Sequence, residues 1–308
     1  MKILEIQKVD LASFCYLNSK RYPFLLESVN HNDFNRYSIL FAFPGESIVL
    51  KSFSDFDFLN ELKNQFKPNN LNSDLPFVGG WFVYLSYELI GQIESSLSSE
   101  VYRSNLPIAY AVKIPSAIII DHQLDKTYLI DQDSNEDRIS SILSDIKLTK
   151  PIPKKAINGE LSEENQEKFT DGVKACLDYI VSGDVFQVNL SRQWQYKLSE
   201  QINSTTIYSA LKNTNPAPFS ALIQYENFSI ISSSPERLFS VNNGVLQTRP
   251  IAGTHPRGKG SEDDTQKENL ISHPKEIAEH VMLLDLERND MGRVCKYGSV
   301  FVNEVMTL

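Results

Sequence analysis

The sequence predicts an α+β chain in which antiparallel strands pack against amphipathic helices. Two observations favour this class over a doubly wound parallel sheet. Several strand-like apolar runs are joined by turns of only two or three residues, which fit antiparallel hairpins. Two segments of the second half repeat apolar residues at the period of a helix, and these lie between the strand-like runs.

Residues 1–150 are rich in short strand-like runs. The runs "IAYAVKIPSAIIIDH" and "KTYLIDQ" flank the turn "QLD", which predicts paired strands. The run "FVGGWFVYLSYEL" opens with Gly79 and Gly80 and predicts a central strand or another buried element. Residues 151–166 are proline-rich, charged and without periodicity, so we predict a linker between this first region and residues 167–308.

The second region starts with a predicted amphipathic helix that ends at Gly183, a residue suited to a helix C-terminus. The alternating run "VFQVNLSRQW" follows it and predicts a strand. Two hairpins are expected next, one turning at Glu226-Asn227 and the other at residues 242–244.

A last helix is predicted from Pro274, with Ser272 as its cap. Its apolar stripe contains Ile277, Val281 and Leu284, which predicts a buried helix. The final run "GSVFVNEVMTL" alternates and predicts one more strand.

Composition narrows the classes of function. The net charge of −9 offers no basic surplus for nucleic acid, so none is expected as a partner. The N-terminus lacks a signal-peptide pattern, and no run approaches the length of a membrane span. The three cysteines are far apart and predict reduced thiols, so we expect a cytoplasmic protein without membrane contact.

Glu276 and Glu279 are three residues apart and therefore share a helix face. They form either a solvated acidic face or a pair of oxygen ligands for Mg²⁺, a hard cation that often shares its ligands with an anionic substrate. His280 beside them is expected to be a core or supporting residue rather than a ligand.

Two further segments carry candidate chemistry. Glu236 in "SSSPERLF" is either a surface residue paired with Arg237 or a general acid or base, a role that calls for a partly buried carboxyl group. The segment "QTRPIAGTHPRG" is a rigid, cationic turn. It is either purely structural or a small anion site formed by the backbone of Gly253 and Thr254.

Together these segments resemble the chorismate-utilising enzymes, namely component I of anthranilate synthase and of aminodeoxychorismate synthase. The resemblance spans almost the whole chain and rests on "PFLLESV", "FVGGWFVYLSYEL", "GDVFQVNLSRQW", "NPAPFSALI", "SSSPERL", "TRPIAGTHPRG" and "HPKEIAEHVMLLDLERNDMGRV". It implies an anthranilate synthase component I-like α/β/β/α fold with antiparallel sheets. It also implies Mg²⁺ and chorismate as ligands, and ammonia supplied by a glutamine amidotransferase partner.

The resemblance assigns roles residue by residue. Glu279 is similar to a Mg²⁺ ligand with Glu276 as its neighbour, Gly253 and Thr254 to chorismate contacts, and Glu236 to the acid that protonates the departing C4 hydroxyl. Ala252 stands where many aminodeoxychorismate synthases have a nucleophilic lysine, so ammonia or another group must act directly here.

The two branches of the family differ in product. Ala252 is typical of anthranilate synthases, whereas Asn189 in "QVNLSR" is typical of the aminodeoxychorismate branch. Because a subgroup of that branch has alanine at the nucleophile position, we favour aminodeoxychorismate synthase component I, which serves p-aminobenzoate and folate synthesis.

Three segments resemble a tryptophan pocket, which is a feedback site in one branch and a structural site in some members of the other. The corresponding positions are Ser28, Phe34, Asn35, Arg36, Tyr37, Pro218, Phe219 and Ser220. The alternative is that these are only core and turn residues.

Members of the family continue well beyond the segment "VMTL", with a histidine, further substrate contacts and a second set of Mg²⁺-binding glutamates. The resemblance therefore implies a fold that is incomplete at the C-terminus and a chain that has little or no amination activity alone. Such a chain could also be an inactive remnant that binds only its partner or tryptophan.

Overall fold

The computed structural model describes residues 1–30, 35–67, 73–97 and 106–308. At its centre lies a seven-stranded sheet in the order β1-β8-β7-β3-β2-β11-β12, with every neighbouring pair antiparallel. In this order the strands are β1 (Lys2–Ile6), β8 (Lys126–Asp131), β7 (Ser116–Asp121), β3 (Tyr37–Ala42), β2 (Phe24–Glu27), β11 (Phe219–Tyr225) and β12 (Phe228–Ser234). The sheet thus joins strands from both sides of residues 151–166.

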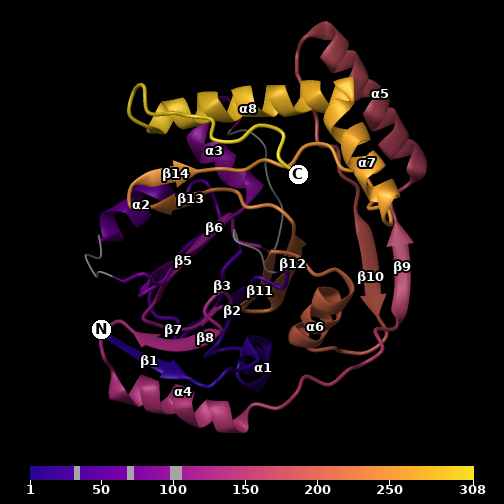
Figure 1. Cartoon of the computed structure of the whole chain (residues 1–308). Helices are drawn as coiled ribbons and strands as arrows, with labels where there is room; N and C mark the ends of the chain where they lie inside the picture. The colour runs from indigo at the N-terminus through magenta and orange to yellow at the C-terminus, as the bar shows by residue number, and fades with distance from the viewer. Residues whose placement is uncertain (31–34, 68–72, 98–105) are drawn as a thin grey trace.

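Helices cover one face of this sheet. They are α1 (Leu11–Leu17), α4 (Glu136–Leu148) and α6 (Ser204–Thr214) (Figure 1). Phe14, Ile142 and Tyr208 from these helices form one buried cluster with Leu40 and Ile118 from the sheet. The apolar side of each helix is buried in this way, while its polar side faces solvent.

A second sheet covers the opposite face. It has the order β4-β6-β5, with β4 (Ser47–Leu50), β6 (Ala109–Ile114) and β5 (Gly80–Leu85). Phe24 of the large sheet stacks on Phe82 of the small one, with ring centroids 4.1 Å apart. The outer face of the small sheet is covered by α2 (Phe58–Gln65), whose Phe58 is buried against Ile48. The layers run helix, sheet, sheet, helix, which confirms the predicted antiparallel α/β/β/α arrangement.

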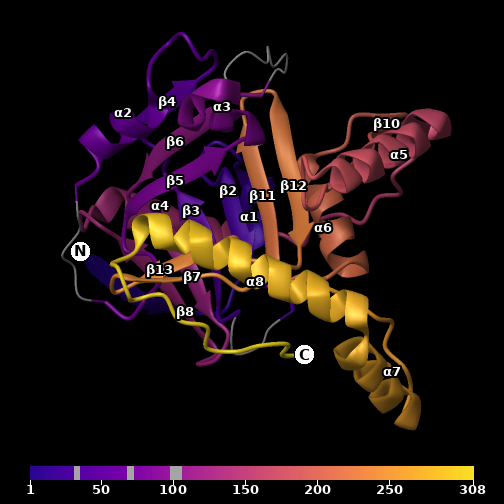
Figure 2. The ribbon, with the colours of Figure 1, turned by 90° about the horizontal axis from the view of Figure 1, so that it is seen from above.

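The remaining elements frame one side of this body (Figure 2). In the chain, α5 (Gln166–Ser182) lies between β9 (Gly159–Glu163) and β10 (Trp194–Leu198), which pair as a two-stranded sheet. The hairpin of β13 (Ser240–Asn242) and β14 (Val245–Gln247) is followed by α7 (Ser261–Ser272) and α8 (Pro274–Val294). Short helical turns η1 (Tyr87–Leu89), α3 (Ile90–Ile93) and η2 (Ser95–Leu97) follow β5.

Several local predictions are confirmed. β7 and β8 pair across the predicted turn, and both predicted hairpins form, with Glu226 and Asn243 at positive φ in their turns. Gly183 ends α5 in the left-handed conformation, as its lack of a Cβ allows. Cys15 is buried, and Cys176 and Cys295 are half-buried free thiols.

Other local predictions were wrong. The run 77–89 gives β5, in which Phe82 is buried as one alternative expected, but β5 is an edge strand of the small sheet rather than a central one. The run 185–194 is irregular until Trp194, and residues 298–308 form no strand. Both runs alternate apolar residues, but the described residues provide no strand edge beside them. The predicted linker 151–166 contains β9, which pairs with β10.

α8 forms where it was predicted, with Pro274 in its first turn, but its cap is His273 rather than Ser272. None of its residues is buried, and Val281 of its apolar stripe is 53% exposed. The prediction of a buried helix was therefore wrong, because no described element packs along that stripe. No helix in the described part of the chain combines the length and apolar character needed to cross a membrane.

Candidate active site

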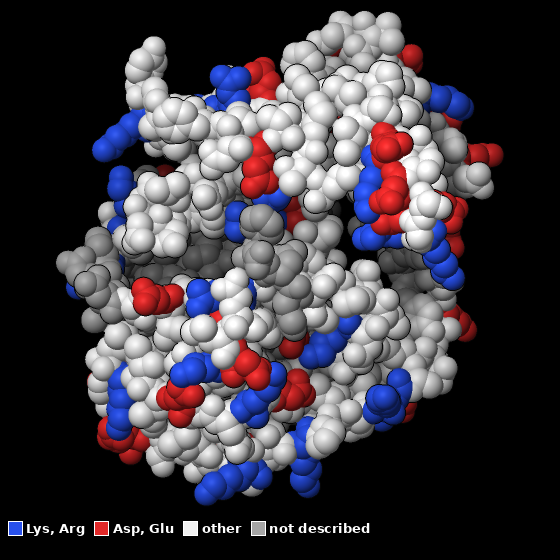
Figure 3. Space-filling view, in the orientation of Figure 1, with Lys and Arg blue, Asp and Glu red and all other residues white. Residues whose placement is uncertain are grey.

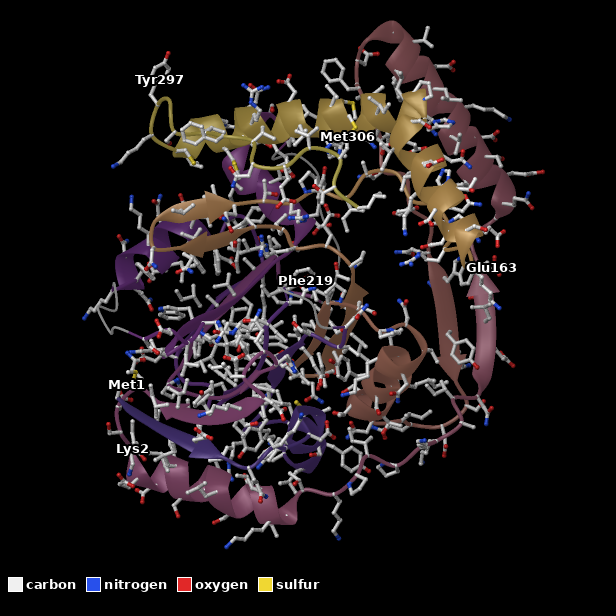
Figure 4. The ribbon with its side chains drawn as sticks, viewed as in Figure 1. Met1, Lys2, Glu163, Phe219, Tyr297 and Met306 are labelled. Carbon is white, nitrogen blue, oxygen red and sulfur yellow. The ribbon has the colours of Figure 1, made fainter. Side chains whose placement is uncertain are left out.

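A cavity of about 360 Å³ lies where segments distant in the sequence meet beside the α7–α8 junction. Residues of the β12–β13 connection, of the loop after β14 and of the two helices line it, together with residues 306–308. Figure 3 shows the surface hollowed between α7 and the body of the molecule. In Figure 4, Met306 below α8 and Phe219 at the start of β11 lie across this space from each other.

The cavity brings together seven of the predicted site residues. They are Asn35, Pro218, Phe219, Glu236, Ala252, Gly253 and Glu276. It therefore joins the predicted chorismate site to part of the predicted tryptophan pocket. Thr254 is exposed and, like Glu279, is not among the lining residues.

Glu236 is positioned by the end of β12. Pro235 follows the last residue of that strand and cannot donate to a sheet, so the chain leaves the sheet there. The Glu236 carboxylate then accepts a hydrogen bond from the backbone N–H of Ile251, with 3.0 Å between Oε1 and N. This bond holds the carboxylate beside Ala252. Glu236 is exposed, as the surface alternative expects, and lacks the partial burial that an acid role was expected to call for.

The loop that follows β14 is anchored at both ends. At its start, the Thr248 hydroxyl donates to Oε1 of Glu287 at 3.1 Å. At its end, the Arg257 guanidinium donates two hydrogen bonds, of 2.6 and 2.8 Å, to the carboxylate of Asp263 in α7. The hydrogen bonds from Arg257, then those from Lys267, lower the pKa of Asp263. Arg257 therefore fixes the conformation of this predicted cationic turn through Asp263 and does not face a ligand.

Gly253 is required by the close approach of Glu276. A Cβ at residue 253 would lie 1.9 Å from Oε2 of Glu276, well inside any contact distance. The Glu276 carboxylate therefore packs directly against the loop backbone. This contact explains why glycine occupies the position: it leaves space for a carboxylate at the cavity wall.

Glu276 and Glu279 offer oxygen ligands of the kind that Mg²⁺ prefers. Both are half-buried on α8, and Glu279 Oε1 accepts a hydrogen bond from Gln187 Nε2 at 3.3 Å. Within the described ranges, no group of three or more acidic, histidine or cysteine side chains could hold a metal. Two carboxylates fit a cation that completes its coordination with water and substrate oxygens.

The His280 side chain bonds to the backbone of Met306 rather than to Glu276 or Glu279. Its Nε2 accepts a hydrogen bond from the backbone N–H of Met306 at 3.1 Å, which joins α8 to the last residues of the chain. The expectation that His280 supports structure is consistent with this contact.

The predicted tryptophan pocket lies where β2, β3 and β11 meet. The Ser28 hydroxyl donates to the carbonyl of Tyr37 at 2.9 Å, and Ser220 pairs with Glu27 across the sheet. Arg36 donates to Asp121, with 2.9 Å between Nε and Oδ1, and this hydrogen bond lowers the pKa of Asp121. Phe34 lies outside the described residues.

Two residues were missed from the sequence: Arg237, which lines the cavity, and Glu287, which lines the space adjoining it. Arg237 directly follows Glu236, and its buried Nε has no hydrogen-bond partner among the described residues. Glu287 binds Thr248, and its pKa is raised by burial and by the nearby charge of Glu236. The helical period offered a signal for Glu287, because it lies eleven residues after Glu276 and thus on the same face of α8.

Fold and site together define a class: a mixed α+β protein with an acidic and a basic group facing one cavity. Residues 17–308 match the family model of chorismate binding enzymes. The chain belongs to this family.

Named relatives fall on both branches. The chain is 35% identical to aminodeoxychorismate synthase component 1 of Bacillus subtilis, covering 94% of this chain and 67% of the relative. It is 34% identical to an anthranilate synthase component I-like protein of Synechocystis, covering 91% of this chain and 60% of that relative. It is 33% identical to anthranilate synthase component 1 of Lactococcus lactis, covering 90% and 66%. The chain thus spans about two thirds of the length of these relatives.

A solved structure supports the fold. Anthranilate synthase component I from Streptococcus pneumoniae aligns with a TM-score of 0.76 at 27% identity, covering 91% of this chain and 67% of that structure.

Proposed function

We propose that the protein is an aminodeoxychorismate synthase component I, which aminates chorismate to 4-amino-4-deoxychorismate for p-aminobenzoate and folate synthesis. The observation that carries the chorismate site is the convergence of Glu236, Gly253 and Glu276 on one cavity. The similarity to the Bacillus subtilis enzyme and the presence of Asn189 favour this branch.

Glu236 acts as the general acid. Its carboxyl group gives a proton to the C4 hydroxyl of chorismate, the C–O bond breaks, and water leaves. Ammonia forms the new C–N bond and returns a proton to the Glu236 carboxylate. Ala252 lines the cavity beside this carboxylate and has no nucleophilic atom, so no covalent bond to the protein forms at this position.

Glu276 and Glu279 are the residues that would hold Mg²⁺. When bound, this cation neutralises and orients the ring carboxylate of chorismate. Gly253 and the backbone of Thr254 complete the binding surface, with Gly253 leaving space for the Glu276 carboxylate.

A glutamine amidotransferase partner supplies the ammonia, and tryptophan binds the pocket formed by Ser28, Arg36 and Ser220 with their neighbours. The pocket proposal rests on the meeting of β2, β3 and β11 at these residues. Tryptophan binding by the purified protein is measured by calorimetry, and Ser28→Trp, which fills the pocket, is the variant expected to prevent it.

The role of Glu236 is tested with Glu236→Gln. The amide oxygen can still accept the hydrogen bond from Ile251, so we expect chorismate affinity to change less than threefold while kcat falls about 10²–10⁴-fold. Turnover is measured on the protein expressed from its own gene, with chorismate, Mg²⁺ and ammonia. An equal loss of affinity and turnover would contradict an acid role.

The alternative is anthranilate synthase component I, which Ala252 favours. Mass spectrometry of the product separates the two, because anthranilate has lost the pyruvyl group. Co-purification with a glutaminase in the absence of Mg²⁺-dependent chorismate binding would instead indicate a protein that only binds its partner.

A further inference from the structure

The hydroxyl group of Thr248 lies where three segments of the candidate site meet. It is within hydrogen-bond distance of two oxygens, namely the backbone carbonyl of Leu238 at 3.2 Å and Oε1 of Glu287 at 3.1 Å. Leu238 belongs to the β12–β13 connection, Thr248 begins the loop after β14, and Glu287 belongs to α8. This one side chain therefore contacts two segments other than its own.

Each of the three segments carries a residue of the proposed function. The β12–β13 connection carries Glu236, the loop after β14 carries Gly253, and α8 carries Glu276. Glu276 and Glu287 are eleven residues apart, which is about three helical turns, so their side chains leave α8 on the same side. The contacts of Thr248 therefore influence how the general acid, the loop backbone and the proposed cation ligand lie relative to one another.

The Thr248 hydroxyl cannot satisfy both oxygens by itself. A threonine hydroxyl has one proton to donate, and a carbonyl oxygen only accepts. When Glu287 is ionised, its carboxylate also only accepts, so the proton of Thr248 serves either Glu287 or Leu238. When Glu287 is protonated, its own O–H donates to Thr248, and the Thr248 hydroxyl donates to Leu238. Only the protonated carboxyl group therefore allows both hydrogen bonds at once.

The surroundings of Glu287 favour this protonated form. Burial raises the pKa of Glu287, and the charges of Glu236 and Asp290 raise it further, whereas the hydrogen bond from Thr248 lowers it. The other charged or titratable groups that line the adjoining cavity, of about 500 Å³, are Arg237, Arg249, His280, Arg288 and Glu304. Glu287 therefore keeps its proton to a higher pH than an exposed glutamate does.

We propose that Glu287 is a positioning residue for the candidate site, and that its protonated carboxyl group joins the three segments through Thr248. The proposal rests on the proposed function, which supplies the ligand of this site. When Glu287 loses its proton, the Thr248 hydroxyl donates to the carboxylate and its bond to Leu238 opens. The connection that carries Glu236 then loses its link to the loop, which weakens the hydrogen bond from the Ile251 N–H to Glu236. A rise in pH therefore loosens the site at the general acid.

The test measures hydrogen exchange by mass spectrometry in peptides that contain Ile251, because the N–H of this residue donates to Glu236. The proteins are the wild type, Glu287→Gln, Glu287→Ala and the control Asp285→Asn. The amide group of glutamine can donate to Thr248 at every pH, as the protonated carboxyl group does. Asp285 is on the same helix and its replacement removes the same charge, but its side chain is 70% exposed and it lines neither of the two cavities.

At pH 6 we expect Glu287→Ala to speed exchange in these peptides by at least about threefold, because a hydrogen bond is lost. Glu287→Gln and Asp285→Asn should stay within about twofold of the wild type. At pH 8 the wild type has lost more of the Glu287 proton, so Glu287→Gln should exchange at least about twofold more slowly than the wild type. Peptides of β7, in the core of the large sheet, should exchange alike in all four proteins at a given pH.

Chorismate binding is then measured by calorimetry with Mg²⁺ at pH 6. We expect Glu287→Ala to raise the Kd of chorismate at least about threefold, and Glu287→Gln and Asp285→Asn to leave it within about twofold of the wild type. An amide that replaces the carboxyl group in binding as well as in exchange separates positioning by a hydrogen bond from a requirement for the charge.

The outcomes separate the two proposals. The role of Glu287 is overturned if Glu287→Ala exchanges like the control, if Glu287→Gln exchanges as fast as Glu287→Ala, or if the ratio of wild type to Glu287→Gln does not rise with pH. Faster exchange of the β7 peptides in Glu287→Ala would also overturn it, because the residue would then serve overall stability. If exchange changes as expected but the wild type does not bind chorismate with Mg²⁺, the proposed function fails while the role of Glu287 in positioning these segments stands.

Discussion

The Glu276 carboxylate packs against the backbone of Gly253 in the candidate site. The glycine has no positive φ, so it is not required for backbone conformation. What excludes a larger residue is the carboxylate of Glu276, which occupies the space of a Cβ. The sequence pattern indicated that Gly253 meets an anionic substrate, and the structure adds an acidic side chain of the protein itself.

Gly253→Ala is expected to displace this carboxylate. The clashing atoms are the far end of a flexible side chain, so the fold should adapt and the Tm should change by less than about 2 °C. The moved carboxylate no longer faces the site, so Mg²⁺-dependent chorismate affinity should fall at least about tenfold. Calorimetry with and without Mg²⁺ measures both affinities.

Gly292→Ala is the matched control. Gly292 lies in α8 with open space around its Cβ position, so alanine should stabilise the helix by about 0.5–1 kcal/mol and leave binding unchanged. Unchanged Mg²⁺-dependent binding in Gly253→Ala would show that Glu276 does not serve the cation.

Local motifs indicate which residues belong to the site, but they do not show that these residues lie close together in space. Glu236, Ala252, Gly253 and Glu276 were all named from local motifs, and the structure places them on one cavity. Arg237 was weighed only as an ion-pair partner of Glu236. The burial of its Nε, which has no hydrogen-bond partner in the described part of the chain, depends on distant segments that no local pattern reveals.

Among the secondary-structure elements, α6 is fixed to β2 through a group of polar side chains around Glu27. Tyr208 is fully buried, and its hydroxyl donates to Oε2 of Glu27 at 2.6 Å. Lys212 donates to the same carboxylate at 3.1 Å. Because Ser28 follows Glu27 directly, this group also positions the predicted tryptophan pocket.

Tyr208→Phe is expected to destabilise the fold by about 1–2 kcal/mol, because the half-buried Glu27 carboxylate loses one of its hydrogen bonds. Urea unfolding measures the change. Tyr179→Phe in α5 is the control, since Tyr179 is 55% exposed and should change stability by less than about 0.5 kcal/mol. Equal effects of the two substitutions would show that the Glu27 contact adds nothing.

The helices α5 and α8 were predicted correctly, but the burial of their apolar sides was not. α5 and α8 form at the predicted places because their apolar period and their ends are local signals. Their apolar sides are nevertheless exposed in part, with Leu177 at 57%. The spacing of apolar residues in the sequence shows which side of a helix is apolar. That side is buried only where another element packs against it.

At the scale of the whole molecule, Asp131 connects the large sheet to helix α4, which covers one of its faces. It lies at the end of β8, accepts from Ser116 of β7 at 2.6 Å and from Arg138 Nε of α4 at 2.7 Å, and is fully buried. Burial opposes the ionisation of Asp131, but the hydrogen bonds from Arg138, Ser116 and the backbone of Asn135 outweigh it and lower its pKa to about 2.

Because the pKa of Asp131 is lower in the folded protein than in the unfolded chain, the free energy of unfolding depends on pH. The contribution of Asp131 is fully present above its unfolded pKa, near 3.8, and is lost as pH falls through about 2. It amounts to about 2 kcal/mol. Urea unfolding at pH 7, 4 and 3 should therefore show a decrease that begins below pH 4.

Asp131→Asn should be less stable than the wild type at pH 7 by about 2 kcal/mol and should lose less on acidification. Asp133→Asn is the control: Asp133 also contacts Arg138, but its side chain is 63% exposed. It should stay within about 0.5 kcal/mol of the wild type. Parallel pH profiles for Asp131→Asn and the wild type would contradict the assignment.

Local sequence patterns suffice to predict the α+β class, the hairpins, the end of α5 at Gly183, Pro274 in the first turn of α8, and the residue types of the site. These depend on turn chemistry and on periods of two and 3.6 residues, which act over a few neighbouring positions. Two features follow from long-range packing alone: β11 and β12 complete the sheet of the first region, and one cavity is lined by Asn35, Phe219, Glu236 and Glu276. Contacts between residues so far apart depend on how whole layers pack, and the packing energy is shared by the entire core rather than encoded in any one segment.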